Sequence, residues 1–386
     1  MIGVARIRGH SIDSGGNGMK FNVISTIGAA TVLAAAIASV FAAAEAAPKI
    51  ESANPFRVGM MALGNGNVEV TVTNTSRKTA RIPQWQLPSV VAESNLFMIS
   101  HNGEEVRYEG RMIKRTTPTA ADFAILRPGQ SHRVKLNLGD AYDLSQTGDY
   151  TITFAAPLQF ASMSGGAQLK QTNGLPMVAQ SAPMRIWVEG GQLDPSERLR
   201  ITAAAKPVVT PSAVVNGVNY VGCTSARQTS AGTAVVSART YATNAKGYLD
   251  AGTTGARYTS WFGAYTSTRY ATAKQNFASI STAINQNAGQ ITINCGCSQN
   301  YYAYVYPTQP YQIYVCNAFW SAPNTGTDSK AGTLIHEMSH FNVVAGTDDW
   351  AYGQAAAKSL AISNPARALD NADSHEYFAE NTPAQN

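Results

Sequence analysis

The sequence is poor in charged side chains, which make up only 14% of its 386 residues, against roughly 25% in ordinary soluble proteins. Small and uncharged polar residues take their place, which is typical of a secreted protein. The net charge is only +5, and no dense run of lysine or arginine occurs, which argues against nucleic-acid binding. The composition also excludes collagen, a coiled coil, a multi-span membrane protein and a chain disordered throughout.

Cysteine is absent from the first 222 residues. All four cysteines lie downstream, together with 14 of the 17 tyrosines. Residues 219–386 carry nine basic and nine acidic side chains, so the net charge belongs to the earlier residues. The length suits two or three domains, and these shifts in composition predict that two differently built parts meet near residue 210.

Charge is also nearly absent from the stretch after Lys20, which is apolar and ends in small residues around Ala44-Glu45-Ala46. A charged start, an apolar middle and a small-residue exit predict a secretory signal peptide over residues 19–46. A transmembrane anchor is the alternative, but the stretch is rich in alanine and ends in a cleavage-like site. We therefore expect a secreted, extracellular protein without stable membrane association. Met19 is the expected translation start, with residues 1–18 a start-site artefact.

Residues 47–190 alternate apolar and polar side chains in short segments that turn residues separate. This pattern predicts an antiparallel β-sandwich, similar in general style to Ig-like extracellular modules. The expected strands are Asn67–Asn74, His132–Leu138, Asp149–Phe154 and Met184–Val188. Residues 191–218 include the stretch AAAKPVVTPSAVVNG, which has two prolines among many small residues and predicts an exposed linker.

Residues 219–386 mix helical and strand patterns, so we expect an α+β domain. The expected helices are Ser225–Leu249, Thr268–Asn287, Asp328–Val343, Tyr352–Ser363 and Ala372–Glu380. Short segments rich in β-branched and aromatic residues predict strands at Gln290–Ile293, Tyr301–Tyr306 and Gln312–Val315.

The sharpest motif is HEMSH, with His336 and His340 four residues apart on a predicted helix. That spacing places both imidazoles on one face, where they can reach one metal ion. Glu337 can reach a water on that metal, as in the H-E-x-x-H motif of zinc peptidases. We expect Asp328 to cap this helix, which would place the motif in its middle turns.

A catalytic zinc needs a third protein ligand and an open position. A metzincin would place a histidine six residues after His340, but that residue is Gly346. A zincin with a glutamate ligand is disfavoured because no glutamate lies between His340 and Glu376. The segment downstream of the motif is instead GTDDWAYG, residues 346–353.

HEMSH together with the downstream GTDDWAYG resembles the aspzincin pattern of deuterolysin and the peptidyl-Lys metalloendopeptidases. The resemblance covers residues 219–386 and includes YTSWFGAYTSTRY, YAYVYP, AFWSAPNTGTDSKAGTLIHE and NADSHEYFAENTPAQN. It implies a zincin-like domain with one zinc ion, whose third ligand beside His336 and His340 is Asp349. Glu337 is then the general base, and Tyr352 stabilises the developing oxyanion.

Asp373 and Glu376 lie three residues apart on a predicted helix and so share a face. They could receive a substrate ammonium group, and the resemblance implies that this pair binds the lysine of a scissile X–Lys bond. His375, between them, is a possible rival metal ligand that we expect to be structural. A solvated acidic face is the alternative interpretation of the pair.

The four cysteines, Cys223, Cys295, Cys297 and Cys316, allow three disulfide pairings, and an exported protein favours disulfides. A metal site built on C-x-C is possible but lacks a matching second pair. The resemblance implies the pairs Cys223–Cys295 and Cys297–Cys316.

Together these features predict a secreted zinc endopeptidase that acts on proteins or peptides and is made as an inactive precursor. The β-rich part would be a propeptide that assists folding and blocks the cleft. Lys206 is the expected site of self-cleavage in the linker, although Pro207 comes directly after it. Lys170, in a flexible-looking stretch, is the expected propeptide lysine in the Asp373/Glu376 pocket. The alternatives are a broad, deuterolysin-like specificity and a non-enzymatic secreted binding protein.

Overall fold

The structure is a computed structural model, and it describes residues 54–386 apart from residues 167, 192, 199–212 and 288. The predicted signal peptide and the expected maturation site at Lys206 lie outside the described residues. Within the described part of the chain, no helix is long and apolar enough to cross a membrane.

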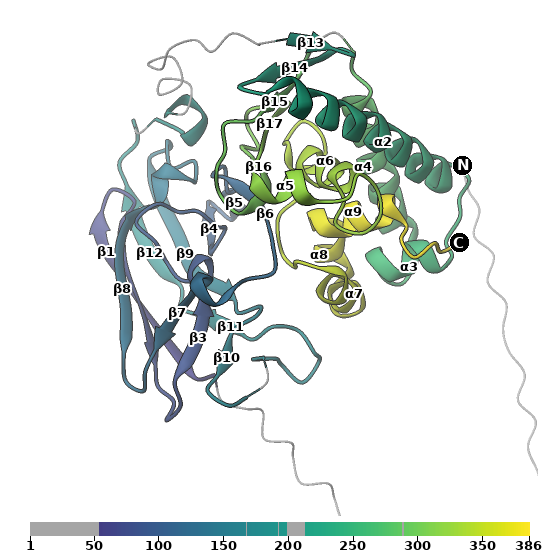
Figure 1. Cartoon of the computed structure of the whole chain (residues 1–386). Coiled ribbons are helices and arrows are strands. Elements are labelled where there is room, and N and C mark those ends of the chain that lie inside the picture. The colour runs from purple at the N-terminus through teal and green to yellow at the C-terminus, as the bar shows by residue number, and fades with distance from the viewer. Residues whose placement is uncertain (1–53, 167, 192, 199–212, 288) are drawn as a thin grey trace, which may run out of the picture. The chain divides into compact units, whose positions relative to one another are not determined.

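The β-rich part consists of antiparallel strands, as its alternating sequence predicts (Figure 1). In β2, for example, Val68, Val70 and Val72 point into the core while the residues between them are more exposed. One sheet has the order β1-β2-β8, a second β10-β3-β7, and a third β11-β9-β4-β5 with β12 also paired to β9. The Ig-like character stays a prediction. The strands are β1 Phe56–Gly64, β2 Asn67–Asn74, β3 Ala80–Pro83, β4 Phe97–His101, β5 Glu104–Glu105, β7 Phe123–Leu126, β8 Ser131–Asn137, β9 Gly148–Pro157, β10 Ser162–Met163, β11 Val178–Gln180 and β12 Met184–Val188.

The C-terminal part is α+β, as predicted, with helices packed on a mixed sheet. The long helix α2 begins where the side chain of Thr224 accepts a hydrogen bond from the Arg227 amide, and it buries a stripe of alanines. The helices are α2 Ser225–Asp250, α3 Ala256–Phe262, α4 Ser267–Ile284, α5 Asn317–Ser321, α6 Lys330–His340, α7 Gln354–Ser363, α8 Pro365–Leu369 and α9 Ala372–Glu380. The strands are β13 Ala213–Val215, β14 Val218–Val221, β15 Ile291–Asn294, β16 Tyr301–Val305 and β17 Gln312–Val315.

The edge of this mixed sheet is occupied by a strand from the β-rich part, β6 Met112–Arg115. The sheet has the order β13-β14-β15-β17-β16-β6, and β6 runs antiparallel to β16. In this register Ile113 lies opposite Tyr304, and Lys114 lies opposite Ala303. A segment of the predicted propeptide therefore covers the edge of the sheet of the C-terminal part, which the sequence did not reveal.

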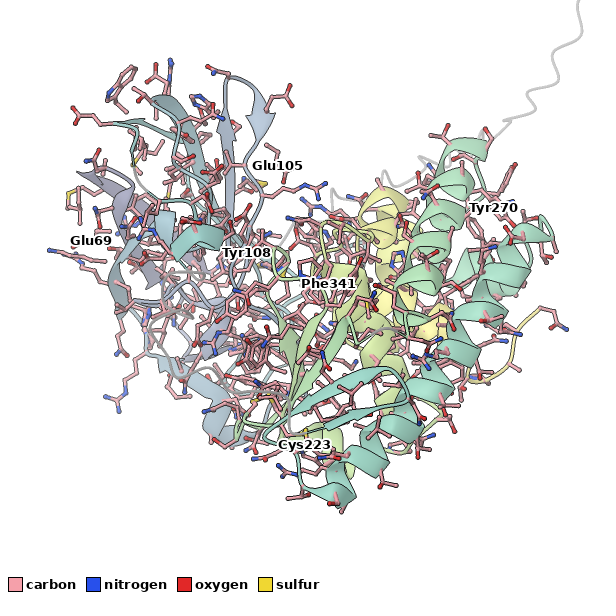
Figure 2. All side chains as sticks on the ribbon, turned by 90° about the horizontal axis from the view of Figure 1, so that it is seen from above. Glu69, Glu105, Tyr108, Cys223, Tyr270 and Phe341 are labelled. Carbon is pink, nitrogen blue, oxygen red and sulfur yellow. A yellow bond between two sulfur atoms is a disulfide. The ribbon has the colours of Figure 1, made fainter. Side chains whose placement is uncertain are left out.

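Both disulfides form as the resemblance implies, between Cys223 and Cys295 and between Cys297 and Cys316. The first joins the start of α2 to the end of β15. Most buried apolar side chains of the two parts, including Tyr108 and Phe341 (Figure 2), belong to one continuous cluster. The β-rich part thus packs on the C-terminal part through a shared hydrophobic core.

Candidate functional site

Helix α6 carries the HEMSH motif, and every one of its residues is buried. It begins at Lys330, and its N-cap is Ser329, whose hydroxyl accepts a hydrogen bond from the Gly332 amide. The predicted cap at Asp328 and the predicted start of the helix there are therefore wrong. Because α6 ends at His340, the motif occupies the last turns of the helix rather than its middle.

The chain turns back immediately after α6 and brings the GTDD segment onto the motif. Gly346 has a φ of +59°, and a Cβ there would lie 2.6 Å from Nη1 of Arg107, so this turn requires glycine. The Thr347 amide then donates to the carbonyl of Ser339, and the Ser339 and Thr347 hydroxyls are 2.6 Å apart. These contacts fix the direction in which Asp349 enters the site.

His336, His340 and Asp349 converge as the metal-site prediction requires. Oδ1 of Asp349 lies 3.3 Å from Nε2 of His336 and 3.6 Å from Nε2 of His340. Both Nε2 atoms and this oxygen are buried, and none has a hydrogen-bond partner among the described residues. Two imidazoles and a carboxylate that offer buried, unsatisfied ligand atoms to one point fit a zinc ion.

Both candidate ligand histidines have an oxygen atom beside Nδ1. The carbonyl of Thr347 lies 2.7 Å from Nδ1 of His340, and Oδ1 of Asp373 lies 2.8 Å from Nδ1 of His336. An oxygen beside Nδ1 favours a proton there and leaves Nε2 to bind the metal. Burial alone would lower the pKa of His336, but Asp349 and the two pocket carboxylates raise it well above its ordinary value, so a metal at its Nε2 would displace a proton. Burial lowers the pKa of His340 to about 4, which keeps it neutral. Burial alone would raise the pKa of Asp349, but the two histidines hold it below its ordinary value.

Glu337, next to the first ligand, is fully buried, and neither of its carboxyl oxygens has a hydrogen-bond partner in the described structure. Burial raises its pKa to about 8. A carboxylate with this affinity for a proton is suited to accept one from water and return it to a leaving amine.

Tyr352 lies beside the metal ligands, and its hydroxyl donates to the carbonyl of Ile113 at 3.2 Å. Burial raises the pKa of Tyr352 well above its ordinary value, so the hydroxyl keeps its proton. The side-chain amide of Gln159 holds the backbone of Tyr352, donating to its carbonyl and accepting from its amide. A residue expected to stabilise an oxyanion therefore already contacts a peptide carbonyl of the β-rich part.

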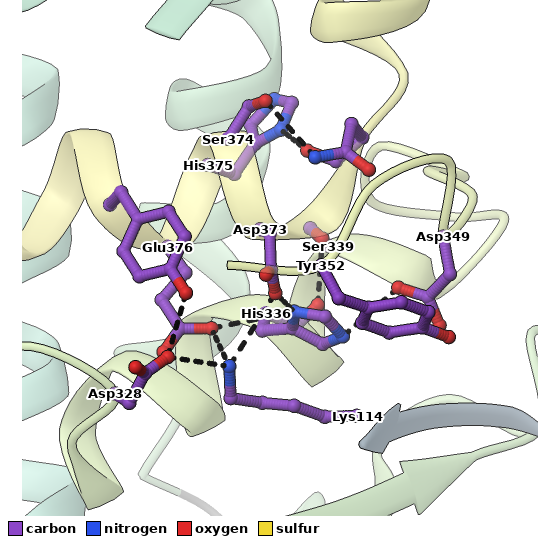
Figure 3. A network of polar contacts seen from close by, with 12 residues as sticks. Lys114, Asp328, His336, Ser339, Asp349, Tyr352, Asp373, Ser374, His375 and Glu376 are labelled. Atoms are coloured by element: carbon purple, nitrogen blue, oxygen red, sulfur yellow. Dashed lines mark hydrogen bonds and ion pairs between the residues drawn. The ribbon is translucent and has the colours of Figure 1, made fainter. Parts of the chain in front are cut away.

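Asp373 and Glu376 face an ammonium group, as predicted, but the lysine is Lys114 (Figure 3). Nζ of Lys114 lies 2.6 Å from Oε2 of Glu376 and 3.4 Å from Oδ1 of Asp373. All three side chains are almost wholly buried. Burial alone would lower the pKa of Lys114, but the surrounding carboxylates raise it well above its ordinary value. The amine is therefore charged in the pocket, and a solvated acidic face is excluded.

The prediction that Lys170 fills this pocket is wrong. Lys170 pairs through an isolated bridge with Pro176. It lines a cavity that Lys114 and Asp373 also line, but it makes no ion pair to either pocket carboxylate in the described structure. Lys114 instead extends from β6, which is pinned to β16 and so delivers the side chain at a defined position.

Sequence reasoning also missed two contributors to the pocket. Oδ1 of Asp328 lies 3.6 Å from Nζ of Lys114 and accepts a hydrogen bond from the Tyr377 hydroxyl at 2.7 Å. The ring of Tyr302 has its centroid 5.1 Å from the same Nζ, within cation–π range. Two features of the sequence could have pointed to these residues. Side chains alternate between the two faces of β16, which includes Tyr302, and Asp328 lies just before α6.

Two neighbouring residues have structural roles. His375 is buried with Nδ1 3.0 Å from the Asn371 carbonyl and Nε2 3.0 Å from Nδ2 of Asn276, so it is not a rival ligand. Asp348 is turned toward the β-rich part, where Asn95 donates to its carboxylate at 2.9 Å.

Comparison with known proteins agrees with this geometry. The sequence profile of the lysine-specific metallo-endopeptidase (aspzincin) family matches residues 248–380. The chain is 44% identical to an extracellular protease of Aeromonas hydrophila, over 83% of its own length and 89% of the relative's. It is 37% identical to a peptidyl-Lys metalloendopeptidase of Armillaria mellea, over 83% and 88%. A peptidyl-Lys metalloendopeptidase of Pleurotus ostreatus is 52% identical over 43% of this chain and 98% of its own length.

Proposed function

The chain belongs to the aspzincin family of zinc metalloendopeptidases, and from this we propose that it is a secreted enzyme, made as an inactive precursor, that cuts on the N-terminal side of lysine. The observation that supports the specificity for lysine is the position of the Lys114 ammonium between Asp373 and Glu376. A non-enzymatic binding protein is excluded by the family.

The described residues suit peptide hydrolysis. His336, His340 and Asp349 would hold the zinc, which when bound supplies the Lewis acidity that makes water a nucleophile near neutral pH. Glu337 accepts the proton of the attacking water and passes it to the departing amine. The Tyr352 hydroxyl donates to the carbonyl oxygen as negative charge develops on it.

Lysine selection rests on the charge and depth of the pocket. Glu376 and Asp373 are buried, so each needs a cation, and an ammonium reaches both at hydrogen-bond or ion-pair distance. A substrate whose residue after the cut lacks a positive charge would leave these carboxylates unpaired. Such a substrate therefore incurs a desolvation penalty that lysine does not.

The β-rich part would inhibit the precursor by occupying the site as a substrate does. With Lys114 in the pocket and the Ile113 carbonyl at Tyr352, the Ile113–Lys114 bond lies where an X–Lys bond would be presented. The pairing of β6 with β16 adds a strand to the sheet edge, a common way to bind an extended peptide. While this strand stays in place, external substrates cannot enter.

Maturation then requires removal of the β-rich part. We propose residues 47–190 as the propeptide, residues 191–218 as a linker cut in or near its middle, and residues 219–386 as the mature enzyme. The Pleurotus ostreatus relative matches this chain over only 167 residues, which are 98% of the relative's own length. This supports a mature enzyme of about the size of residues 219–386. Self-cleavage before Lys206 is our candidate event.

The proposal is tested with paired peptides that differ only at the residue after the scissile bond. The matured protein should hydrolyse the lysine peptide at least tenfold faster than its arginine or leucine counterpart, and a chelator should abolish hydrolysis. Equal rates on all three peptides would instead support a broad, deuterolysin-like specificity.

A further inference from the structure

The carboxylates around the Lys114 ammonium differ in what else they contact. Asp328 is held by Tyr377 on the outer side of the pocket, and its side chain is 41% exposed. Asp373 lies on the inner side, and its Oδ1 faces both Nζ of Lys114, at 3.4 Å, and Nδ1 of His336, at 2.8 Å. One carboxylate oxygen thus lies between the substrate pocket and a metal ligand (Figure 3).

The two ligand histidines are supported unequally. Nδ1 of His340 lies beside the neutral carbonyl of Thr347, whereas Nδ1 of His336 lies beside two carboxylates, Asp373 at 2.8 Å and Glu376 at 3.4 Å, of which Asp373 is the nearer. A carboxylate partner makes the imidazole a stronger metal ligand and fixes the orientation of its ring. Asp373 is itself immobilised, because its other oxygen accepts a hydrogen bond of 2.6 Å from the Gly353 amide.

We propose that Asp373 is a positioning residue for the zinc ligand His336 as well as a wall of the lysine pocket, so that zinc affinity and lysine binding are coupled. The second half of this statement rests on the proposed function. A lysine ammonium beside Asp373 draws on the negative charge that supports His336, and it adds a positive charge near the metal. By linkage, zinc and the ammonium each weaken the binding of the other.

His336, Asp373 and Glu376 also bring ligand atoms within 4.8 Å of one another, which suggests a second metal site. The ammonium of Lys114 occupies that position, and His336 would have to lose both ring protons to bind two ions. The geometry therefore favours an ammonium site over a second metal site. The number of zinc ions bound per chain tests this choice.

The experiment measures zinc affinity by competition with a chelating dye, using the full-length precursor with the additional change Glu337→Gln to prevent self-cleavage. We expect Asp373→Asn to weaken zinc binding by about 10- to 100-fold. The matched control Asp328→Asn touches the same ammonium but not His336, and it should change zinc affinity by less than about twofold.

A second variant leaves Asp373 in place and still tests the coupling between zinc and the ammonium if Asp373→Asn does not fold. Lys114→Met removes the ammonium and should raise zinc affinity by about fivefold or more, whereas Lys170→Met should not. Unchanged affinity in Asp373→Asn or Lys114→Met, equal loss in Asp328→Asn, or two zinc ions per chain would overturn the inference. A parent precursor that binds no zinc would instead overturn the proposed function.

Discussion

The two parts of the chain contribute to one site in opposite ways. The C-terminal part supplies the candidate metal ligands, the proposed general base and the pocket carboxylates, and it holds both disulfides. The β-rich part has no cysteine and contributes a strand, β6, with one buried lysine. The C-terminal part, which we propose to be the mature enzyme, is cross-linked by disulfides. The β-rich part, which we expect to be removed, is held to it only by noncovalent contacts. This difference suits a precursor whose inhibitor must eventually leave.

The change Glu337→Gln should have the largest effect, because it removes only the proton acceptor. We expect hydrolysis of an X–Lys peptide by the matured protein to fall by about 10²- to 10⁴-fold, with zinc binding retained. The variant precursor should also fail to shorten on incubation, as gel electrophoresis would show. Maturation of the purified variant at the parent's rate would mean that processing is not autocatalytic.

Removal of a disulfide should destabilise the C-terminal part more than the β-rich part. The Cys297–Cys316 bridge spans 19 positions, so the double change Cys297→Ser and Cys316→Ser should cost about 3 kcal/mol. Hydrogen exchange should show lost protection in β15–β17 and α6, while amides of β2, β8 and β9 keep theirs. Equal loss in both parts would show that they unfold as one unit.

Lys114→Met should release the block without touching the catalytic residues. Without the ammonium, Asp373 and Glu376 lose their buried counter-charge and β6 binds the edge less tightly. We expect the intact precursor to cleave a short X–Lys peptide about tenfold faster than the parent, and Lys170→Met to leave the rate unchanged. A release of activity by the Lys170 variant and not by the Lys114 variant would reverse the assignment.

A smaller effect should appear in the β-rich part as a function of pH. Burial, with help from Asp143 and Asp194, raises the pKa of Glu109 from 4.5 to about 7. The folded state then binds this proton more tightly than the unfolded state, so the stabilisation is complete below pH 4.5 and is lost as the pH rises through about 7. Glu109→Gln should therefore raise the unfolding temperature at pH 8 by about 2 °C.

Well below pH 4.5 the Glu109→Gln variant and the parent should unfold at the same temperature, since Glu109 is then neutral in both the folded and the unfolded parent. A matched change of the exposed Glu104 should have no effect at either pH. A stabilisation of equal size at both pH values would mean that the charge of Glu109 is irrelevant.

The contrast between the two parts also shows what the sequence could and could not predict. The spacing of His336 and His340 sufficed to place them on one helix face, and the resemblance to the aspzincin pattern added Asp349. All three candidate ligands lie within 14 residues. Helix α9 likewise presents Asp373 and Glu376 on one face, as their spacing required. Strand β2 and helix α9 were predicted to the residue, because strong alternation or helical spacing defines them.

Lys114 could not be found in this way, because its partner Glu376 lies 262 positions later in the chain and the two meet only through the pairing of β6 with β16. Periodicity within a segment does not say which edge a strand will join. The predicted cap at Asp328 failed for a related reason. Its left-handed backbone, with a φ of +51°, turns it toward the pocket, and Ser329 takes the cap.

The most direct test of lysine-directed, metal-dependent cleavage is a map of cut sites. The matured protein would digest a denatured, lysine-containing protein with and without a chelator, and mass spectrometry would identify the new termini. We predict that nearly all new N-termini are lysines and that none form with the chelator present. New N-termini without preference for lysine, or cleavage that persists without metal, would contradict this prediction.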